Sequence, residues 1–440
     1  MKKRLLATLL SSTLVMTSLA GCSSKSENGD MVTELTKPIT IEMWHYMNGG
    51  QADALNSIIE DFNATNDKGI TVNAISQGSI VDLNKKVISA AQSNSLPAII
   101  NVYPDIATGL IEDKKLVNLS SFINDKNVGM ADEMDDFVDS FIQETSQWNN
   151  GEVYGLPMTK STEVLYVNKN MLESLGYTLE DLEGLTFEKL AEISNKAVTE
   201  LGVAGFGFDS SSNAFISSLK MNGLDFVDSK GTINVDNEWV REYMTFFQKQ
   251  AESGAFRIAG EDKFLSNPFV NQKMLCYQGS SAGYAYLNNG GAFEIAVVEV
   301  PVFEGKDKAV MQQGASLFVT NNVSAEAQYA AYEFVKFATN AENTAKFATA
   351  TGYLPVRKSA VETEIVKNIL NDETSLYSQV YNVAQKSLPY SYYTPAINNA
   401  QSARTVAQEK YEAFMSGSIK DVEVLVDDIV SQVQTSIGRN

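Results

Sequence analysis

Few residues of this chain could carry out catalysis, because the side chains that most often do so are scarce. The 440 residues include one histidine, His45, and two cysteines, Cys22 and Cys276. A zinc site made from several histidines is therefore impossible, and any Ser-His-Asp arrangement would have to use His45. The glycines at 205 and 207 are not followed by the third one that a phosphate-binding loop needs. We therefore predict no catalytic residue, no metal and no cofactor.

Carboxylate pairs leave one catalytic alternative open. Glycoside hydrolysis needs two carboxyl groups at a suitable separation, and the chain has 54 aspartates and glutamates. Spacing along the sequence says nothing about their separation in space. A surface glycoside hydrolase therefore stays as the enzyme alternative to a binding protein.

Cys22 points to chemistry of a different kind. It follows Leu19-Ala20-Gly21 at the end of a leader that begins with three basic residues and continues with an apolar run over 5–19. This order is typical of a bacterial lipoprotein signal, and the run is too short to span a bilayer. We predict that the signal peptide, 1–21, is removed and that Cys22 is lipidated. The lipid, palmitate among its acyl chains, would anchor the protein at the extracellular face of the cell membrane. An ordinary secretory signal followed by a chance cysteine is the alternative.

The charge of the mature chain excludes some partners. The formal net charge of −20 becomes −23 when the leader takes its three positive charges away. Such a chain is not drawn to nucleic acid or to anionic lipid by charge. Only Cys276 is then left as a thiol, so an intrachain disulfide is impossible. Residues 22–37 are polar and unpatterned, which predicts a flexible tether.

The body of the chain alternates short strands with amphipathic helices. Ile39, Ile41 and Met43 alternate as in a strand, and a second strand begins at Ile70. Between them, apolar residues recur at helical spacing: Leu55, Ile58, Ile59 and Phe62. This βαβ order predicts a parallel sheet covered by helices. Further strands are predicted at 98–102, 164–167, 295–300 and 316–319, and a closing helix at 422–433.

Several segments of the body carry recognisable sequences in a fixed order. They are Gly-Glu-Val-Tyr-Gly-Leu-Pro at 151–157, Ser-Thr-Glu-Val-Leu-Tyr-Val-Asn-Lys at 161–169, Gly-Ala-Ser-Leu-Phe-Val at 314–319 and Thr-Gly-Tyr-Leu-Pro-Val at 351–356. They resemble the crossing strands and ligand loop of the family 1 extracellular solute-binding proteins, which are receptors of ABC importers. The resemblance implies a two-lobed α/β fold of the periplasmic-binding-protein type II, with a ligand cleft between lobes joined by crossing strands. It places lobe 1 at 38–155 and 315–353, and lobe 2 at 156–314 and 354–440.

Within that family the chain resembles the glycerol-3-phosphate and glycerophosphodiester receptors, because their ligand positions match one by one. The resemblance implies that the ligand is held by Ser161, Thr162, Ser281, Gly314, Tyr353 and Arg404. A guanidinium suits a phosphate, since it can give two parallel charge-assisted hydrogen bonds to the phosphate oxygens.

Two departures from the family pattern bear on the ligand. The stretch 209–212, Asp-Ser-Ser-Ser, replaces a tryptophan pair, and Pro104 replaces an acidic residue. Asp105, next to that proline, and Asp209 are therefore predicted as ligand contacts. Hydroxyls and a carboxylate in place of an aromatic platform favour a more hydroxylated solute, so a neutral oligosaccharide is the alternative ligand.

Other residues have two interpretations each. Trp44 and His45 end the first strand, where open α/β sheets expose side chains to a cleft, so we predict ligand contact; a packed histidine is the alternative. The tyrosines at 390, 392 and 393 could stack on a sugar or hold a loop between the lobes. Arg404 could form a surface pair with Glu409 instead of binding ligand.

Taken together, these features predict a lipid-anchored, monomeric receptor of an ABC importer. Its partners would be a small-molecule solute (a sugar, a polyol phosphate or a glycerophosphodiester) and the transmembrane subunits of an ABC permease, with no nucleic acid. Closure of the lobes around the solute would precede delivery. A sensor lipoprotein on the same fold is the remaining alternative.

Overall fold

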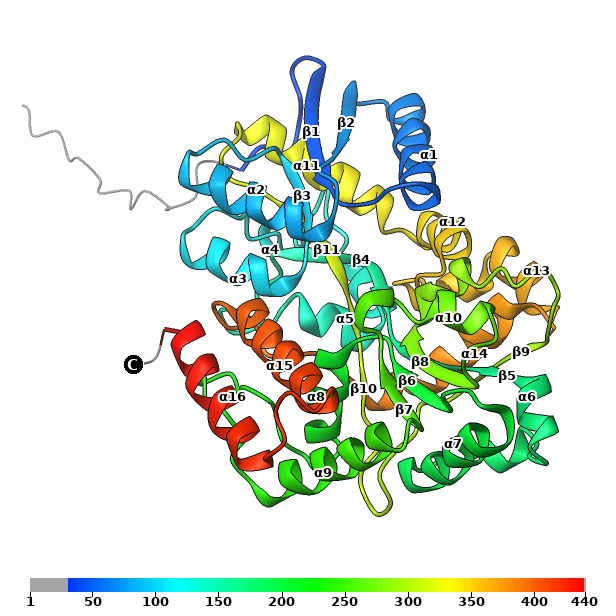
Figure 1. Ribbon diagram of the computed structural model, residues 1–440. Coiled ribbons are helices and arrows are strands. Elements are labelled where there is room, and N and C mark those ends of the chain that lie inside the picture. The colour runs from blue at the N-terminus through cyan, green and yellow to red at the C-terminus, as the bar shows by residue number, and fades with distance from the viewer. Residues whose placement is uncertain (1–30, 373, 439–440) are drawn as a thin grey trace, which may run out of the picture. The chain divides into compact units, whose positions relative to one another are not determined.

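A computed structural model of the protein describes residues 31–372 and 374–438, and Val32–Asn440 forms one compact unit. Two five-stranded sheets organise this unit, and the chain passes from one sheet to the other more than once (Figure 1). We call each sheet with its covering helices a lobe. The leader and Cys22 lie outside the described residues. No helix in the described ranges is long and apolar enough to cross a membrane.

The first sheet has the strand order β2-β1-β3-β11-β4. Strand β1 is parallel to β2 and β3, whereas β11 is antiparallel to β3 and β4. The strands are β1 (Ile39–His45), β2 (Ile70–Ser76), β3 (Ile99–Val102), β4 (Gly155–Ser161) and β11 (Gln313–Val319). The predicted βαβ unit is confirmed, since helix α1 connects the parallel pair β1 and β2.

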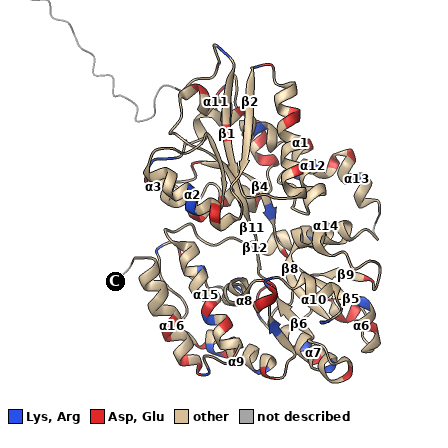
Figure 2. Ribbon diagram, turned by 45° about the horizontal axis from the view of Figure 1, so that its top comes forward, with Lys and Arg blue, Asp and Glu red and all other residues tan. Residues whose placement is uncertain are grey.

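Helices cover both faces of the first sheet (Figure 2), because successive strand residues point to opposite sides. Ile41 and Met43 pack with α1 and α11, whereas Trp44 packs with α2 and α3. All four apolar residues predicted for the α1 face are buried. The helices are α1 (Gly50–Thr65), α2 (Ile80–Gln92), α3 (Pro104–Glu112), α4 (Ser120–Ile123), α5 (Asp139–Glu144), α11 (Ala325–Ala338) and α12 (Ala341–Thr351), with a 3₁₀ turn η1 (Ala131–Asp136).

The second sheet has the order β7-β6-β8-β5-β9, and its central strand β8 is antiparallel to β5. Its strands are β5 (Glu163–Asn168), β6 (Phe206–Phe208), β7 (Phe256–Ile258), β8 (Cys276–Ser280) and β9 (Ile295–Val298). Its helices are α6 (Lys169–Ser174), α7 (Phe187–Leu201), α8 (Ser211–Lys220), α9 (Glu238–Glu252), α10 (Ser266–Val270), α14 (Leu376–Ser387), α15 (Ala400–Met415) and α16 (Val422–Ser436). Helix α13 (Glu364–Leu370) and the 3₁₀ turns η2 (Glu180–Leu182), η3 (Gly260–Asp262), η4 (Ser281–Tyr286), η5 (Lys358–Glu362) and η6 (Leu388–Tyr390) complete the described helices.

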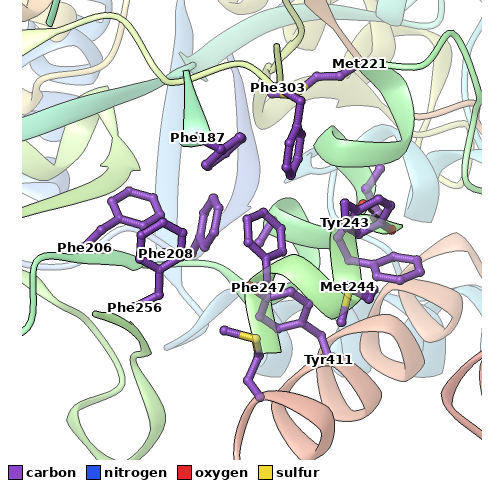
Figure 3. Packing of buried hydrophobic residues seen from close by; sticks show 14 of the residues in the cluster. Phe187, Phe206, Phe208, Met221, Tyr243, Met244, Phe247, Phe256, Phe303 and Tyr411 are labelled. Atoms are coloured by element: carbon purple, nitrogen blue, oxygen red, sulfur yellow. Dashed lines mark hydrogen bonds between the residues drawn. The ribbon is translucent and has the colours of Figure 1, made fainter. Parts of the chain in front are cut away.

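The core of the second lobe is rich in aromatic rings (Figure 3). Phe187 lies 5.3 Å from Phe247 in an edge-to-face arrangement and 4.6 Å from Phe303, measured between ring centroids. Such pairs contribute about 0.5–1.5 kcal/mol each beyond their burial. Cys276 is buried in this core, and burial raises the pKa of its thiol. Residues of α8 and α15 belong to this core, so the core fixes the position of both helices.

The chain changes lobes beside the first sheet's edge. All of β4 pairs with β11, so the chain leaves the first sheet at Ser161 and not at Gly155. The reason is that all seven residues of β4 are buried and continue the ladder. We therefore propose a lobe boundary at Thr162 in place of the predicted 155/156. A short parallel ribbon of β10 (Val310–Met311) and β12 (Ser391–Tyr392) precedes the return crossing into β11.

Candidate functional site

A cavity of about 170 Å³ collects residues from both lobes. Its described lining consists of Tyr103, Pro104, Asp105, Glu144, Ser212, Met311, Gln312, Gln313, Gly314, Thr394, Pro395, Ala396, Gln401, Arg404 and Gln408. Three residues predicted from the sequence, Asp105, Gly314 and Arg404, meet there. A larger cavity of about 680 Å³ beside α14 contains no predicted site residue. The first cavity is therefore the candidate site.

Two helices from opposite lobes begin at the cavity. Helix α3 starts at Pro104, and helix α8 starts at Ser211 with the Ser210 side chain accepting a hydrogen bond from the backbone N–H of Asn213. The first residues of each helix line the cavity. The N-terminus of a helix carries partial positive charge and free N–H groups, so α8 favours an anion or a polar oxygen in this place. At α3 the Asp105 side chain itself accepts from the N–H of Ile106 at 2.8 Å, so this helix presents a carboxylate to the cavity.

Arg404 enters the cavity from α15. Its neighbours Ala403 and Ala407 are buried against the second lobe, which fixes the helix and leaves Arg404 half-buried at the edge. The Nη2 atom donates to Asn213 Oδ1 at 2.6 Å and to Ser212 Oγ at 3.3 Å. The alternative of a surface pair with Glu409 is not found among the described contacts of Arg404. The guanidinium instead belongs to the cavity wall.

A buried polar network continues from Asn213 and was not predicted from the sequence. The Asn213 Nδ2 atom donates to Glu163 Oε1 at 2.8 Å and to Gln313 Oε1 at 2.9 Å. Gln278 Nε2 donates to the other oxygen of Glu163 at 2.9 Å. One signal in the sequence could have revealed this network, since a glutamate opens the otherwise apolar strand β5. A buried carboxylate needs such partners.

Acidic groups surround the guanidinium. Burial raises the pKa of Asp105. The hydrogen bond from the N–H of Ile106 and the positive charge of Arg404 act in the opposite direction and lower this pKa. Burial likewise raises the pKa of Glu163. Glu144 also lines the cavity, but it has its own cation, because the buried Lys160 forms an ion pair with it. Arg404 is the only cation among the described residues of the lining.

Three tyrosines lie together in the first lobe. The hydroxyl of Tyr46 is 3.4 Å from that of Tyr353 and 3.1 Å from Oγ1 of Thr159, and the ring of Tyr46 is 6.4 Å from that of Tyr103. Burial raises the pKa of all three phenols, so they stay neutral and can donate or accept hydrogen bonds. Tyr353 was predicted as a ligand residue but does not line the cavity, whereas Tyr103 lines it and was not predicted.

Thr162 and Ser281, where the chain crosses between the lobes, are joined by two hydrogen bonds. Ser281 N donates to Thr162 O at 2.7 Å, and Thr162 N donates to Ser281 Oγ at 3.3 Å. Ser161 is buried at the end of β4. The Thr162 hydroxyl is buried without a hydrogen-bond partner in the described structure. These residues lie where the lobes join, but none of the three lines the cavity.

Three other predicted contacts also lie away from the cavity. Trp44 packs in the core beneath α2, with Lys86 4.4 Å above its ring, because the register of β1 turns it to that face. His45 is buried, accepts a hydrogen bond from Met47 N and has a pKa lowered by burial, as the packed alternative required. Asp209 accepts from Leu265 N at 2.6 Å, and burial raises its pKa to about 6.

The tyrosines after α14 hold the loop in place. Tyr392 shares a hydrogen bond of 2.9 Å with Ser217, and Tyr390 donates to Glu299. A lysine ammonium also lies over each ring, Lys308 at 5.2 Å from the Tyr390 centroid and Lys220 at 5.6 Å from that of Tyr392, which favours the structural interpretation of these two over sugar stacking.

Neither a serine nucleophile paired with His45 nor a metal site is found in the described ranges. Residues 279–283, Gly-Ser-Ser-Ala-Gly, have the form G-x-S-x-G, but the central Ser281 bonds to Thr162 and not to His45. No group of three or more histidine, cysteine, aspartate or glutamate side chains in the described residues is placed to hold a metal ion.

Comparisons with known proteins agree on one family. The model of the family described as "Bacterial extracellular solute-binding protein" matches residues 57–371. The sn-glycerol-3-phosphate-binding periplasmic protein UgpB of Rhizobium meliloti is 22% identical over 90% of this chain and 94% of its own length. UgpB of Escherichia coli is 23% identical over 86% of this chain and 88% of its own length.

Solved structures share the fold. UgpB of Mycobacterium tuberculosis, in complex with glycerophosphocholine, has a TM-score of 0.79 at 21% identity and covers 92% of this chain and 99% of its own. The cyclic alpha-maltosyl-1,6-maltose binding protein of Arthrobacter globiformis has a TM-score of 0.76 at 18% identity, with 92% and 100% covered. The two-lobed α/β fold predicted from the sequence is thereby confirmed.

Proposed function

The chain belongs to the bacterial extracellular solute-binding proteins, and on that premise we propose that it is the lipid-anchored receptor of an ABC importer for a glycerophosphodiester. The family consists of binding proteins and not of enzymes, which agrees with the prediction from the sequence. The protein acts as a monomer that takes up its solute between the lobes and delivers it to the transmembrane permease subunits.

The placement of Arg404 carries the proposal. Its guanidinium lines a cavity at which two helices begin, one from each lobe. A phosphate oxygen in this cavity would receive charge-assisted hydrogen bonds from the guanidinium and favourable partial charge from the N-terminal end of α8. The glycerol-3-phosphate-binding relatives support a phosphorylated glycerol compound as the ligand class.

The acidic surroundings favour a solute with a single negative charge. Asp105 has no ion-pair partner among the described residues and senses the charge of Arg404 across the cavity. A phosphodiester carries one negative charge, whereas a phosphomonoester carries about two at neutral pH. One guanidinium can balance the first but not the second, so we prefer a diester to glycerol 3-phosphate. The glycerophosphocholine complex of a related fold is consistent with this choice.

A neutral oligosaccharide is the second candidate. Carboxylates and neutral phenols accept hydrogen bonds from sugar hydroxyls, and Asp105, Glu144 and Tyr103 all line the cavity. The maltose-type binding proteins among the solved structures of this fold support the same alternative. It differs from the first candidate in leaving Arg404 without an anion.

Binding and anchoring follow from the architecture. A solute that contacts both lobes stabilises their closed arrangement by the difference of its affinities for the two states. The crossing strands at Ser161 and Gln313 are the connections about which the lobes would move. Lipidation at Cys22 would hold the protein beside its permease. A sensor lipoprotein would share these features, and retained solute uptake after deletion of the gene would favour it.

A thermal-shift screen of the mature protein without its lipid tests the ligand class. Glycerophosphocholine, glycerol 3-phosphate, sugar phosphates and neutral oligosaccharides are compared at equal concentration. A ligand at one hundred times its dissociation constant adds about 2.7 kcal/mol of stability. Stabilisation by glycerophosphodiesters supports the proposal. If neutral sugars alone stabilise the protein, its assignment as a receptor stands, but the proposed ligand becomes an oligosaccharide.

A further inference from the structure

Glu163 is a carboxylate buried at the junction of the lobes without a cation in hydrogen-bond contact. Only 4% of its surface is exposed. Both of its oxygens accept from neutral amides, Oε1 from Asn213 at 2.8 Å and Oε2 from Gln278 at 2.9 Å. Burying an ionised group in this way is unfavourable unless something else requires it. The nearest charge of opposite sign is that of Arg404, which lies one residue further along the network.

The contacts of Asn213 fix the direction of its amide. A side-chain amide has two donor hydrogens on nitrogen and acceptor lone pairs on oxygen. The nitrogen is directed at two acceptors, Glu163 Oε1 and Gln313 Oε1, at 2.8 and 2.9 Å. The oxygen must therefore face the other way, where Arg404 Nη2 lies 2.6 Å from it. Glu163 and Gln313 thus hold the amide in the one orientation that suits the guanidinium, which can only donate.

This network affects the charge that a ligand meets. Asn213 and Ser212 already occupy Nη2 of Arg404, while Nη1 lies 3.2 Å from the sulfur of Met311. The guanidinium is therefore held against α8 and offers only part of its donor set to a solute. The negative charge of Glu163 behind it offsets part of the attraction to a ligand anion.

We propose that Glu163, acting through Asn213, is a positioning residue for Arg404 and makes the site select singly charged phosphodiesters over doubly charged phosphomonoesters. The inference rests on the proposed function, because it presumes a phosphorylated solute. The inference goes beyond the proposed function in two ways. It assigns a role to Glu163, and it predicts a preference for singly charged ligands that Arg404 alone does not provide. Asp105 and Asp209 are the other acidic groups that act on this network, and both lie in its surroundings as further negative charges.

The test measures the affinities of glycerophosphoglycerol and glycerol 3-phosphate at pH 8 by calorimetry, since both contain the glycerol phosphate and no cation, and the diester carries one negative charge where the monoester carries about two. Wild type should bind the diester at least tenfold more tightly. Glu163→Gln removes the charge and should shift the ratio toward the monoester by about tenfold. Glu163→Asp keeps the charge but cannot reach both amides, and it should weaken both ligands without shifting the ratio. Glu294→Gln, an exposed glutamate of the same lobe, makes the same change in net charge and should shift nothing.

The outcomes separate the two claims. A wild type that binds neither phosphorylated ligand overturns the proposed function. A wild type that binds the monoester as tightly as the diester overturns the selection rule alone, and so does an unchanged ratio in a folded Glu163→Gln variant. If the substitutions at the buried Glu163 prevent folding, the ratio of the two affinities in the wild type still tests the selection rule, because that measurement needs no variant.

Discussion

The Nζ atom of Lys160 donates a hydrogen bond of 3.1 Å to the carbonyl oxygen of Gly314, which joins the two strands that run between the lobes at the edge of the cavity. Lys160 is fully buried in β4, and the same ammonium forms an ion pair with Glu144 of α5. Since Glu144 lines the cavity, the crossing strands and the site share one ion pair. Interactions at this position therefore serve both stability and binding.

Removing one member of that pair should be costly. Glu144→Gln leaves a buried ammonium without its counter-charge, and we expect a loss of about 3–5 kcal/mol in the free energy of unfolding. Glu294→Gln is the matched control, because Glu294 is exposed, its partner Lys169 is partly exposed, and surface pairs contribute about 0–1 kcal/mol. Urea unfolding of both variants measures the difference. Equal losses would show that burial of the pair has no effect.

Gly314 should not tolerate a side chain. Its φ is +126°, and an added Cβ would lie 1.6 Å from the carbonyl oxygen of Thr159. We expect Gly314→Ala to separate β11 from β4, lowering stability by more than about 3 kcal/mol and weakening ligand binding. Gly290→Ala is the control with positive φ and open space around it, where about 1 kcal/mol is expected. Thermal unfolding measures the loss of stability and calorimetry the loss of ligand affinity. A similar loss of stability in both variants would contradict a role for the close approach between Gly314 and the carbonyl oxygen of Thr159.

Arg404 should be sensitive even to a conservative change. Lysine keeps the charge but lacks the fork that bonds phosphate and Asn213 together, so Arg404→Lys should weaken glycerophosphodiester binding by about 100-fold, and Arg404→Ala by more. Arg241→Lys, in a surface pair with Glu423, is the control and should leave affinity unchanged. If Arg404→Ala bound every phosphorylated ligand like wild type, the phosphate assignment would be lost.

The pKa of Asp209 predicts a pH dependence of stability. Burial raises it to about 6, above the value near 3.9 in the unfolded chain. Between about pH 4 and 6 the folded state therefore binds more protons, so this group's contribution to the free energy of unfolding falls as the pH rises, by up to about 3 kcal/mol. Asp209→Asn should equal wild type near pH 4 and exceed it near pH 7, as measured by urea unfolding. The exposed Asp67→Asn is the control, and parallel curves for Asp209→Asn would refute the prediction.

Cys22 should determine where the protein resides. With the native leader, metabolic labelling by palmitate should mark the wild type and not Cys22→Ala, and the variant should leave the membrane fraction. The mature body should still bind ligand, because the first residue of the cavity lining, Tyr103, lies 81 residues after Cys22 and on the folded lobes. Label retained in Cys22→Ala would exclude lipidation at this cysteine.

Residue patterns along the chain were enough to predict the local order of strands and helices. The 2-residue alternation of Ile39, Ile41 and Met43 and the helical spacing in α1 were sufficient, because each reports which face of an element is apolar. Family motifs pointed to Gly314 and Arg404, which line the candidate cavity, and to Tyr353, which does not. Glycine at a close approach and arginine in a fixed helix register leave a signal in the sequence. The scarcity of histidine and cysteine correctly argued against catalysis.

Tertiary structure alone decided which side chains meet. Glu163, Asn213 and Gln313 lie in three segments, and only the pairing of strands and the packing of α8 bring them to Arg404. Likewise, Trp44 faces the core because its side of β1 is covered by α2. A pattern of apolar residues does not specify which helix covers which side of a strand. Hydrogen bonds and ion pairs act over a few ångströms in space, whereas sequence spacing records distance only within one element, so the network behind the arginine became visible only in the folded lobes.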